Sequence, residues 1–209
     1  STHADASGNG TLTPEGVVDH VVTRALERIA ASGDTLKADQ AEARTIFNNE
    51  VLPFIDTDLM ARFAMGPAAR RAEPADIERL SAALAERVAN LYSGALQRYA
   101  DEAVDFAKAG EVFLRTVTED DKRAIVMARV SGPHVEDLNL RIQLYQRDAR
   151  WRVFDIESSG VSILLVFRDA LQSAAGRDGG VDAMIAALEE GAVDVEQAWE
   201  EAEGETETQ

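Results

Sequence analysis

Apolar residues in the first part of the chain recur at helical spacing. Thr13 is a capping residue and Pro14 suits the first position of a helix. The apolar residues that follow are spaced three or four positions apart, so they form one stripe on one face of a helix. The sequence therefore predicts a helix that ends near Ser32 and Gly33 and carries the stripe Val17, Val18, Val21, Val22, Ala25, Leu26 and Ile29.

Three more helices are expected before residue 101. The first covers Lys37 to Asn49, with Ala41, Ile46 and Phe47 turned inward. Asp56 caps the second, from Thr57 to Met65, which ends at Gly66 and Pro67. The third is the longest, from Glu73-Pro74 to about Ala100, and its apolar face consists of Ile77, Leu80, Leu84, Val88, Leu91, Tyr92, Ala95, Leu96 and Tyr99.

After Ala100 the apolar period changes from helical to alternating. Leu138, Leu140, Ile142 and Leu144 alternate with polar residues, which is typical of an antiparallel strand with one buried face. In the last strand, the alternation places Trp151, Val153 and Asp155 on one side and Arg152, Phe154 and Ile156 on the other. Turns are expected at Gly132-Pro133 and at Arg147-Asp148-Ala149. The predicted strands are Val104–Phe106, Val112–Val117, Arg123–Val130, Leu138–Gln146 and Trp151–Ile156.

The end of the chain returns to helical spacing. Val161 to Ala174 is an apolar helix whose only charges are Arg168 and Asp169, and a shorter amphipathic helix follows Gly179-Gly180. A helix this apolar must be covered on nearly every side. The pattern fits a helix central to an ordinary core, and it equally fits one side of a cavity for an apolar ligand. The fold class is α+β, an antiparallel sheet of about four strands packed with N-terminal and C-terminal helices.

Composition narrows the classes of partner. The net charge of −17 in 209 residues argues against nucleic acid and against electrostatic attachment to anionic membranes. Seven carboxylates and no Lys or Arg lie in residues 191–209, and removing these seven leaves −10 for the rest. We expect 1–13 to be a disordered lead-in, such as remains after removal of a leader, 14–190 to form a single domain, and 191–209 to be a disordered acidic tail. Trp199 is the exception, because it could dock on the body.

The sequence contains little evidence for a catalytic site. A nucleophilic Ser162 would need a histidine, and His3, His20 and His134 have no motif that links them to it. Asp155 and Glu157 form a possible acid/base pair, but Asp155 is better explained as a hydrogen-bond acceptor for the following turn. Ser162 itself fits a helix-start hydroxyl. Without cysteine, a His-x-x-x-His pair or a glycine-rich phosphate loop, we predict no metal, no cofactor and no enzyme. A hydrolase using Ser162 or Asp155 is kept as a third hypothesis, behind the two binding functions considered below.

Four segments, in order, resemble one protein family. They are Val51-Leu-Pro-Phe-Ile-Asp56, then Ala61-Arg-Phe-Ala-Met-Gly66 with Ala69-Arg-Arg-Ala-Glu-Pro-Ala-Asp76, then Leu91-Tyr92 through Tyr99, and finally Trp151-Arg-Val-Phe-Asp-Ile through Arg168 with Gly179 to Leu188. Together they resemble the MlaC family, the periplasmic phospholipid-binding toluene-tolerance proteins of Gram-negative bacteria. The resemblance covers roughly residues 15–190.

The resemblance implies a function and a set of partners. Such proteins carry a phospholipid between an outer-membrane lipoprotein complex and an inner-membrane ABC-type transporter complex, and so maintain outer-membrane lipid asymmetry. On this basis we expect a periplasmic, monomeric carrier whose cargo is a glycerophospholipid. The alternative is an interaction or scaffold protein of the same fold with a closed core. We expect the acidic tail to be dispensable for lipid binding and to steer encounter with a basic partner surface.

The resemblance and the convergence of apolar faces together suggest a lipid-binding pocket. The long helix, one face of the sheet and the apolar helix can all point inward. Arg168 is expected to be structural or partner-facing, with Asp155 or Asp182 as its carboxylate. The residues predicted to line the pocket are Leu91, Tyr92, Leu96, Leu114, Val126, Ile142, Leu144, Phe154, Ile156, Val161, Leu164 and Leu165.

Overall fold

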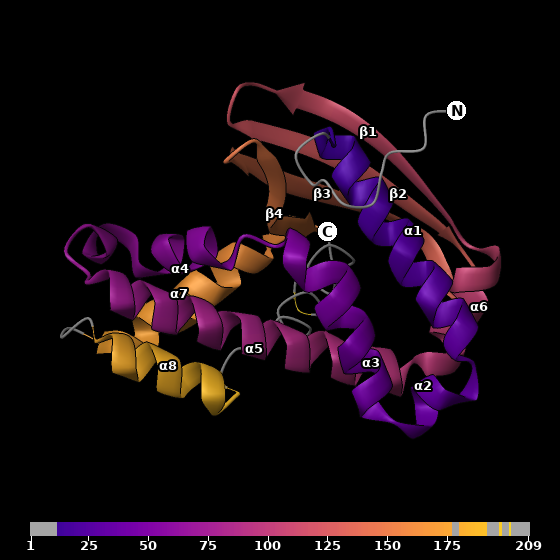
Figure 1. Cartoon of the computed structure of the whole chain (residues 1–209), viewed down its shortest axis with the longest axis horizontal. Coiled ribbons are helices and arrows are strands. Elements are labelled where there is room, and N and C mark those ends of the chain that lie inside the picture. The colour runs from indigo at the N-terminus through magenta and orange to yellow at the C-terminus, as the bar shows by residue number, and fades with distance from the viewer. Residues whose placement is uncertain (1–11, 177–179, 192–196, 198–200, 202–209) are drawn as a thin grey trace.

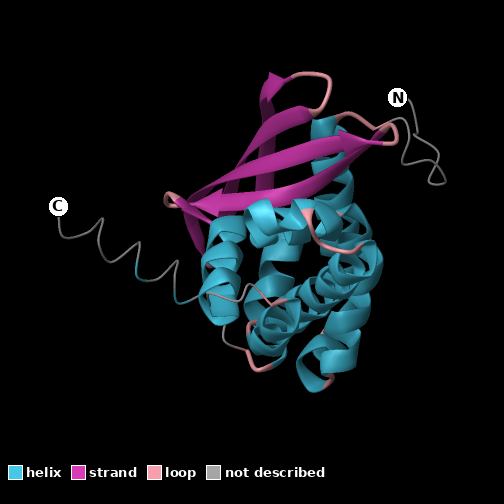
Figure 2. Ribbon diagram, turned by 90° about the vertical axis from the view of Figure 1, so that its left-hand side faces the viewer, coloured by secondary structure: helices cyan, strands magenta, loops and turns pink. Residues whose placement is uncertain are grey.

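The computed structural model describes residues 12–176, 180–191, 197 and 201. An antiparallel sheet in the order β1-β2-β3-β4-β5 forms one layer, and the helices pack beneath one face of it (Figures 1 and 2). The α+β fold predicted from the sequence is confirmed. Its helices are α1 (Pro14–Ser32), α2 (Asp34–Ala38), α3 (Gln40–Ile46), α4 (Thr57–Met65), α5 (Pro74–Arg98), α6 (Ala100–Ala109), α7 (Ile163–Ala175) and α8 (Val181–Glu189).

The sheet is a meander joined by short turns, and its long strands match the predicted ones. Asp148 and Ala149 both have positive φ, 54° and 61°, which identifies a two-residue hairpin turn between β3 and β4. The β2–β3 turn passes through Pro133 and His134, as the Gly132-Pro133 signal predicted. The strands are β1 (Glu111–Glu119), β2 (Arg123–Gly132), β3 (Val135–Arg147), β4 (Arg150–Ser158) and β5 (Val161–Ser162).

Two predicted elements are wrong. Val104–Phe106 is not a strand but the middle of α6, because Ala100, Ala103, Val104 and Ala107 pack together at helical spacing. The helix predicted over Lys37 to Asn49 is interrupted at Asp39, whose side chain caps the new helix through the backbone N–H of Ala41, 2.9 Å away. Ala41 is therefore exposed, and Ala43 is buried in its place.

The simple alternation predicted for β4 is also wrong. Gln143 pairs with Asp155 and Leu144 pairs with Val153, so Phe154 is an extra residue in a β-bulge. The bulge shifts the alternation by one position. Val153 and Ile156 consequently face the same core, although a regular strand would point them to opposite sides.

Three clusters of buried apolar residues hold the layers together. The largest joins α4, α5, α7 and α8 and centres on Leu80, Leu84, Phe167 and Leu171. The second joins α1 to the inner face of the sheet through Val17, Val126 and Leu144, and the third joins α1, α2, α3 and α6. Between these clusters the helices and the sheet do not close completely.

An apolar cavity between the sheet and the helices

A cavity of about 580 Å³ lies where the three clusters meet. Its volume falls in the range of small-molecule sites, roughly 300–1,000 Å³. α1 and α5 contribute one side, β3 and β4 the other, and the segment between α3 and α4 closes it. The lining residues are Val18, Val21, Val22, Ala25, Ile29, Ile46, Phe47, Val51, Phe54, Ile55, Met60, Val88, Tyr92, Ala95, Leu96, Leu138, Leu140, Ile142, Val153, Phe154, Asp155, Ile156 and Ile163.

Of the described residues in this wall, only Tyr92 and Asp155 have polar side chains. Burial raises the pKa of the Tyr92 hydroxyl above its ordinary value, and the Tyr92 ring stacks on Phe47 with centroids 5.9 Å apart. Asp155 accepts hydrogen bonds from the Ser162 hydroxyl at 2.7 Å and from the Leu164 N–H at 3.1 Å. Among the described residues, no Lys or Arg lines the cavity. The site therefore offers apolar contact and no cationic group for an anion.

The segment between α3 and α4 supplies much of the wall in a compact form. It consists of a π-helical turn, η1 (Phe47–Val51), and a 3-10 turn, η2 (Leu52–Phe54), which precede the cap residue Asp56. In η1 the buried Glu50 pairs with Arg28 of α1 at 3.1 Å and with Arg24 at 3.7 Å. This pairing fixes the distance between α1 and the turn that faces it across the cavity.

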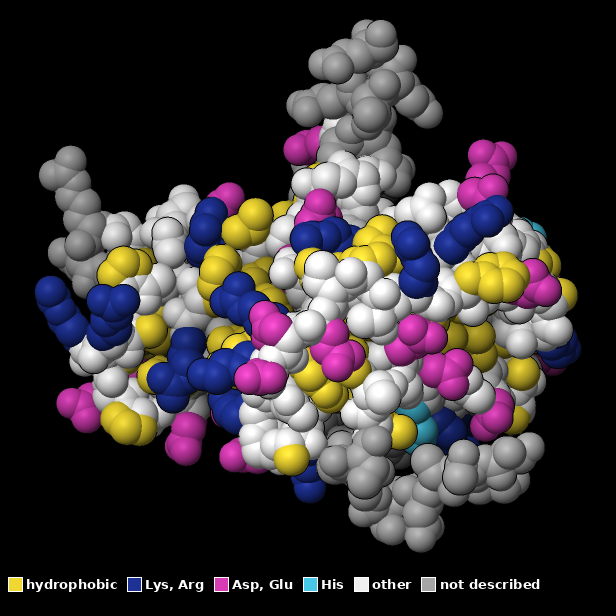
Figure 3. Space-filling view, turned by 90° about the horizontal axis from the view of Figure 1, so that it is seen from above, with side chains coloured by type: hydrophobic (Ala, Val, Ile, Leu, Met, Phe, Trp, Pro, Cys, Tyr) yellow, Lys and Arg dark blue, Asp and Glu magenta, His cyan; other side chains and the backbone are white. Residues whose placement is uncertain are grey.

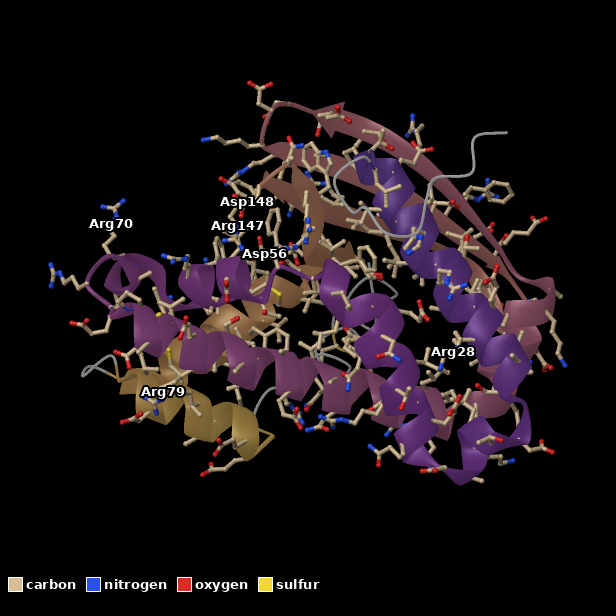
Figure 4. All side chains as sticks on the ribbon, in the orientation of Figure 1. Arg28, Asp56, Arg70, Arg79, Arg147 and Asp148 are labelled. Atoms are coloured by element: carbon tan, nitrogen blue, oxygen red, sulfur yellow. The ribbon has the colours of Figure 1, made fainter. Side chains whose placement is uncertain are left out.

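Asp56 attaches the same segment to the sheet. It is 2 % exposed, caps α4 through the Leu59 N–H, and pairs with Arg147 at the end of β3 at 2.9 Å. The Asp56 backbone N–H also donates to the Val153 carbonyl at 2.8 Å. Figure 4 shows Asp56 and Arg147 together where the helical layer meets the β3–β4 turn. Glu50 and Asp56 thus hold opposite ends of the cavity wall.

The structure places part of the predicted pocket at this cavity. Tyr92, Leu96, Ile142, Phe154 and Ile156 line it. The other seven residues do not line this cavity, and the lipid contacts of all twelve stay a prediction. Leu91 and Leu164 belong to the cluster around α5 and α7, Leu114, Val126 and Leu144 belong to the cluster under α1, Val161 lies in β5, and Leu165 is 40 % exposed.

These residues do not line the cavity because neighbouring elements cover them. The apolar helix α7 packs its buried face against α4 and α8, so only Ile163 at its first turn reaches the cavity. Val126 and Leu144 are covered by α1, which lies directly over the inner face of β2 and β3. The sequence correctly indicates that all these faces point inward, but it does not indicate which neighbour covers them.

The largest group of lining residues missed by the sequence analysis lies on α1. Val18, Val21, Val22, Ala25 and Ile29 line the cavity, although the stripe was recognised as a helical face. Val51, Phe54 and Ile55 were also missed. The apolar segment around Pro53 contains these three residues. Such an apolar segment is usually buried, so the sequence did indicate that they face the interior.

Arg168 has partners other than those predicted. Its guanidinium hydrogen-bonds the neighbouring Asp169 at 3.1 Å and lies over the ring of Phe63, 5.6 Å from the centroid. Asp155 bonds the start of α7, and Asp182 pairs with Arg79 at 2.6 Å. This contact with Phe63 turns the Arg168 side chain toward α4.

The hydroxyl of Ser162 makes structural hydrogen bonds. It donates to Asp155 and accepts from the Leu165 N–H at 3.1 Å, which is the helix-start role expected from sequence. His20 packs on Phe54, and His134 contacts Asp105 at 2.9 Å. Within the described ranges, no cluster of three or more His, Cys, Asp or Glu side chains is arranged to hold a metal. Among the same residues, no helix combines the length and hydropathy needed to cross a membrane.

Comparison with known proteins identifies a family and similar proteins. The model of the family described as MlaC protein matches residues 19–190. The toluene tolerance protein ttg2D of Pseudomonas putida is 26 % identical over 170 residues, which span 80 % of this chain and 75 % of that protein. The fold also matches a phospholipid-binding protein of Ralstonia solanacearum, solved in complex with a phospholipid, with a TM-score of 0.71 and 20 % identity over 85 % of this chain and 95 % of that one. This chain, with its apolar cavity between sheet and helices, belongs to the MlaC family.

Proposed function

We propose that this chain is a periplasmic carrier of glycerophospholipids that binds the acyl chains of its cargo in the apolar cavity. The observation that carries the proposal is the composition of the cavity wall, in which all residues but Tyr92 and Asp155 are apolar. Each methylene moved from water into such a wall contributes roughly 0.8 kcal/mol. Family membership and the phospholipid complex of the Ralstonia protein support the same cargo.

The head group is expected to stay outside the cavity. A phosphate buried among these residues would meet no Lys or Arg, and an unpaired charge in an apolar site is strongly unfavourable. The affinity would then come from the acyl chains, and head-group discrimination by the cavity would be weak. A carrier that binds its cargo in this way needs a partner to take it over, which fits exchange with an inner-membrane ABC-type transporter complex and an outer-membrane lipoprotein complex.

The cavity favours a carrier over the two alternatives. A scaffold protein with a closed core has no need for an apolar space of about 580 Å³. A hydrolase using Ser162 or Asp155 would need these groups free to react with substrate, whereas the Ser162 hydroxyl accepts from the Leu165 N–H and Asp155 accepts from both the Ser162 hydroxyl and the Leu164 N–H. We therefore propose binding and transfer without catalysis.

The proposal is tested by native mass spectrometry of gently purified protein, followed by extraction and identification of the bound molecules. A glycerophospholipid in a fixed ratio to the protein is the expected result. A transfer assay then follows a labelled phospholipid from the loaded protein to acceptor vesicles, with and without the transporter complex. Protein that purifies empty and takes up no phospholipid from vesicles would contradict the proposal.

A further inference from the structure

Tyr92 brings a polar group to the middle of an apolar wall. On α5, the residues one helical turn before and after it, Val88 and Leu96, both line the cavity, and so does Ala95. Positions three and four apart share one face of a helix, so the Tyr92 side chain is directed at the cavity. Its ring stacks on Phe47 of η1 with an angle of 12° between the two ring planes, which restricts the position of the hydroxyl.

The Tyr92 hydroxyl forms no hydrogen bond with any residue that the structure describes. This is unusual, because a buried tyrosine hydroxyl normally has a partner. Burial alone accounts for the raised pKa of this hydroxyl. The oxygen keeps some accessible surface, and because Tyr92 lines the cavity, that surface borders the cavity space. The hydroxyl is therefore a donor that is available to a molecule in the cavity.

Asp155, the second polar residue of the described wall, differs from Tyr92 in its hydrogen bonds. It already accepts from the Ser162 hydroxyl and the Leu164 N–H. Gln143 donates to it as well, from Nε2 at 3.1 Å. An ionised carboxylate only accepts hydrogen bonds, and the acyl part of a glycerophospholipid has ester carbonyl oxygens but no N–H or O–H group to donate. Tyr92 therefore complements an acyl ester, whereas Asp155 does not.

The depth of Tyr92 in the cavity matches the place of an ester in such a lipid. Among the lining residues, Val88 and Ile142 are only 4 % and 6 % exposed, whereas Leu96 and Leu138 are partly exposed. The cavity therefore opens toward the second half of α5 and the start of β3. Tyr92 lies on α5 between the buried end of the cavity and this opening. In a phospholipid, the ester carbonyls likewise lie between the acyl chains and the head group.

The outer surface on the sheet side is a poorer place for acyl chains than the cavity. Figure 3, which views the molecule from that side, shows hydrophobic side chains scattered between charges of both signs. Acyl chains favour continuous apolar surface, because the stabilisation grows with the apolar area removed from water. The described wall of the cavity is apolar except for Tyr92 and Asp155, so an ester bound there meets one donor side chain, Tyr92.

We propose that the Tyr92 hydroxyl donates a hydrogen bond to an ester carbonyl of the bound phospholipid, and that the protein thereby prefers ester-linked to ether-linked lipids. The inference rests on the proposed function, because it requires the acyl chains to lie in this cavity. An ether lipid has no carbonyl oxygen at this place and leaves the buried hydroxyl without a partner, which is unfavourable. A site that hydrogen-bonds one polar group of a ligand discriminates against the analogue that lacks this group.

The test compares dipalmitoyl phosphatidylcholine with its dihexadecyl ether analogue, which has the same head group and chains of the same length. Lipid-free protein takes up lipid from vesicles that contain equal amounts of both, and native mass spectrometry gives the ratio of the two complexes. We expect the parent protein to favour the ester by about tenfold, as one buried hydrogen bond can supply. Tyr92→Phe keeps the ring that stacks on Phe47 and should lose this preference. The matched control Tyr99→Phe makes the same change at the exposed end of α5 and should keep it.

Infrared spectroscopy of the ester lipid, isotope-labelled at its carbonyl carbons, detects the bond itself. One carbonyl should absorb at a lower frequency in the parent complex than in the Tyr92→Phe complex, because a hydrogen bond weakens the C=O bond. Identical carbonyl bands in the two complexes would overturn the proposal. A parent protein that binds both lipids equally, or a preference that Tyr92→Phe retains, would also overturn it and leave the carrier function standing. A parent protein that takes up neither lipid would overturn both the inference and the proposed function.

Discussion

The closed core around α5 and the cavity beside it are built from the same kinds of residue on the same helix. Leu84 is fully buried between α4, α7 and α8, and Leu96, three turns further along α5, borders the open space. The difference lies in what faces them. Around Leu84 three helices converge, whereas around Leu96 the opposing wall is a sheet and a turn held in place by ion pairs. The hollow is therefore a property of how elements are held apart and not of residue type.

The two regions should differ most in the stability that is lost when a leucine is truncated to alanine. Leu84→Ala should lower the free energy of unfolding by about 2–5 kcal/mol, because it opens a new void in a closed core. Leu96→Ala removes atoms that already border a space, so only a transfer cost of about 1 kcal/mol is expected. Urea unfolding of the lipid-free proteins measures both. Equal losses would mean that the cavity wall is as tightly packed as the core.

The ion pair between Asp56 and Arg147 is expected to stabilise the region of the cavity specifically. Asp56→Ala removes a helix cap and a buried pair, and should lower the free energy of unfolding by about 2 kcal/mol. Asp58→Ala, on the exposed side of the same helix turn, is the matched control and should change it by less than about 0.5 kcal/mol. A similar small loss in both variants would show that Asp56 does not hold the wall.

The same pair is expected to influence retention of cargo. Without it, the η1–η2 segment loses its ion pair to the sheet and keeps the backbone bridge to Val153 and the packing of Phe54. Loaded Asp56→Ala protein should therefore release a labelled phospholipid to vesicles faster than loaded Asp58→Ala protein. Identical release rates would confine the role of the pair to folding stability.

Alkaline pH is expected to have a smaller effect on the stability of the cavity region. Burial raises the pKa of Tyr92 above its ordinary value near 10, so the folded state keeps its proton while the unfolded state loses it. Stability from this group is fully present below pH 10 and declines as the pH rises above it. Tyr92→Phe should flatten the decline in melting temperature between pH 9 and pH 11. Curves of the same slope for both proteins would show that the Tyr92 hydroxyl is solvated.

The sequence predicted the fold well because its signals are local. Thr13, Asp56 and Ser162 each cap a helix where expected, and the Asp148 turn sets the register of the last two long strands. It failed at Val104–Phe106, where three residues were too few to separate helix from strand. It also missed the bulge at Phe154, which depends on how β4 pairs with β3 and leaves no signal in β4 alone.

The cavity was less accessible to prediction than the fold. Tyr92, Leu96, Ile142, Phe154 and Ile156 line the cavity because they lie on apolar faces that do converge. Leu164 and Val126 lie on equally apolar faces that meet a neighbouring helix instead. Whether an inward face is packed or hollow depends on contacts between distant segments, such as Glu50 with Arg28, which periodicity does not encode. The acidic segment 192–209, including the predicted dispensability of the tail, lies almost wholly outside the described residues.

The most direct test of the central claim is to fill the cavity and count the bound lipid. Ala95→Trp places an indole in the space that α5 borders, and Ala82→Trp places the same indole on the exposed side of α5. Native mass spectrometry of both purified proteins gives the fraction that carries phospholipid. We predict that Ala95→Trp is folded and largely empty, while Ala82→Trp is loaded like the parent protein. A folded Ala95→Trp protein that carries phospholipid at the parent ratio would contradict the claim that this cavity holds the acyl chains.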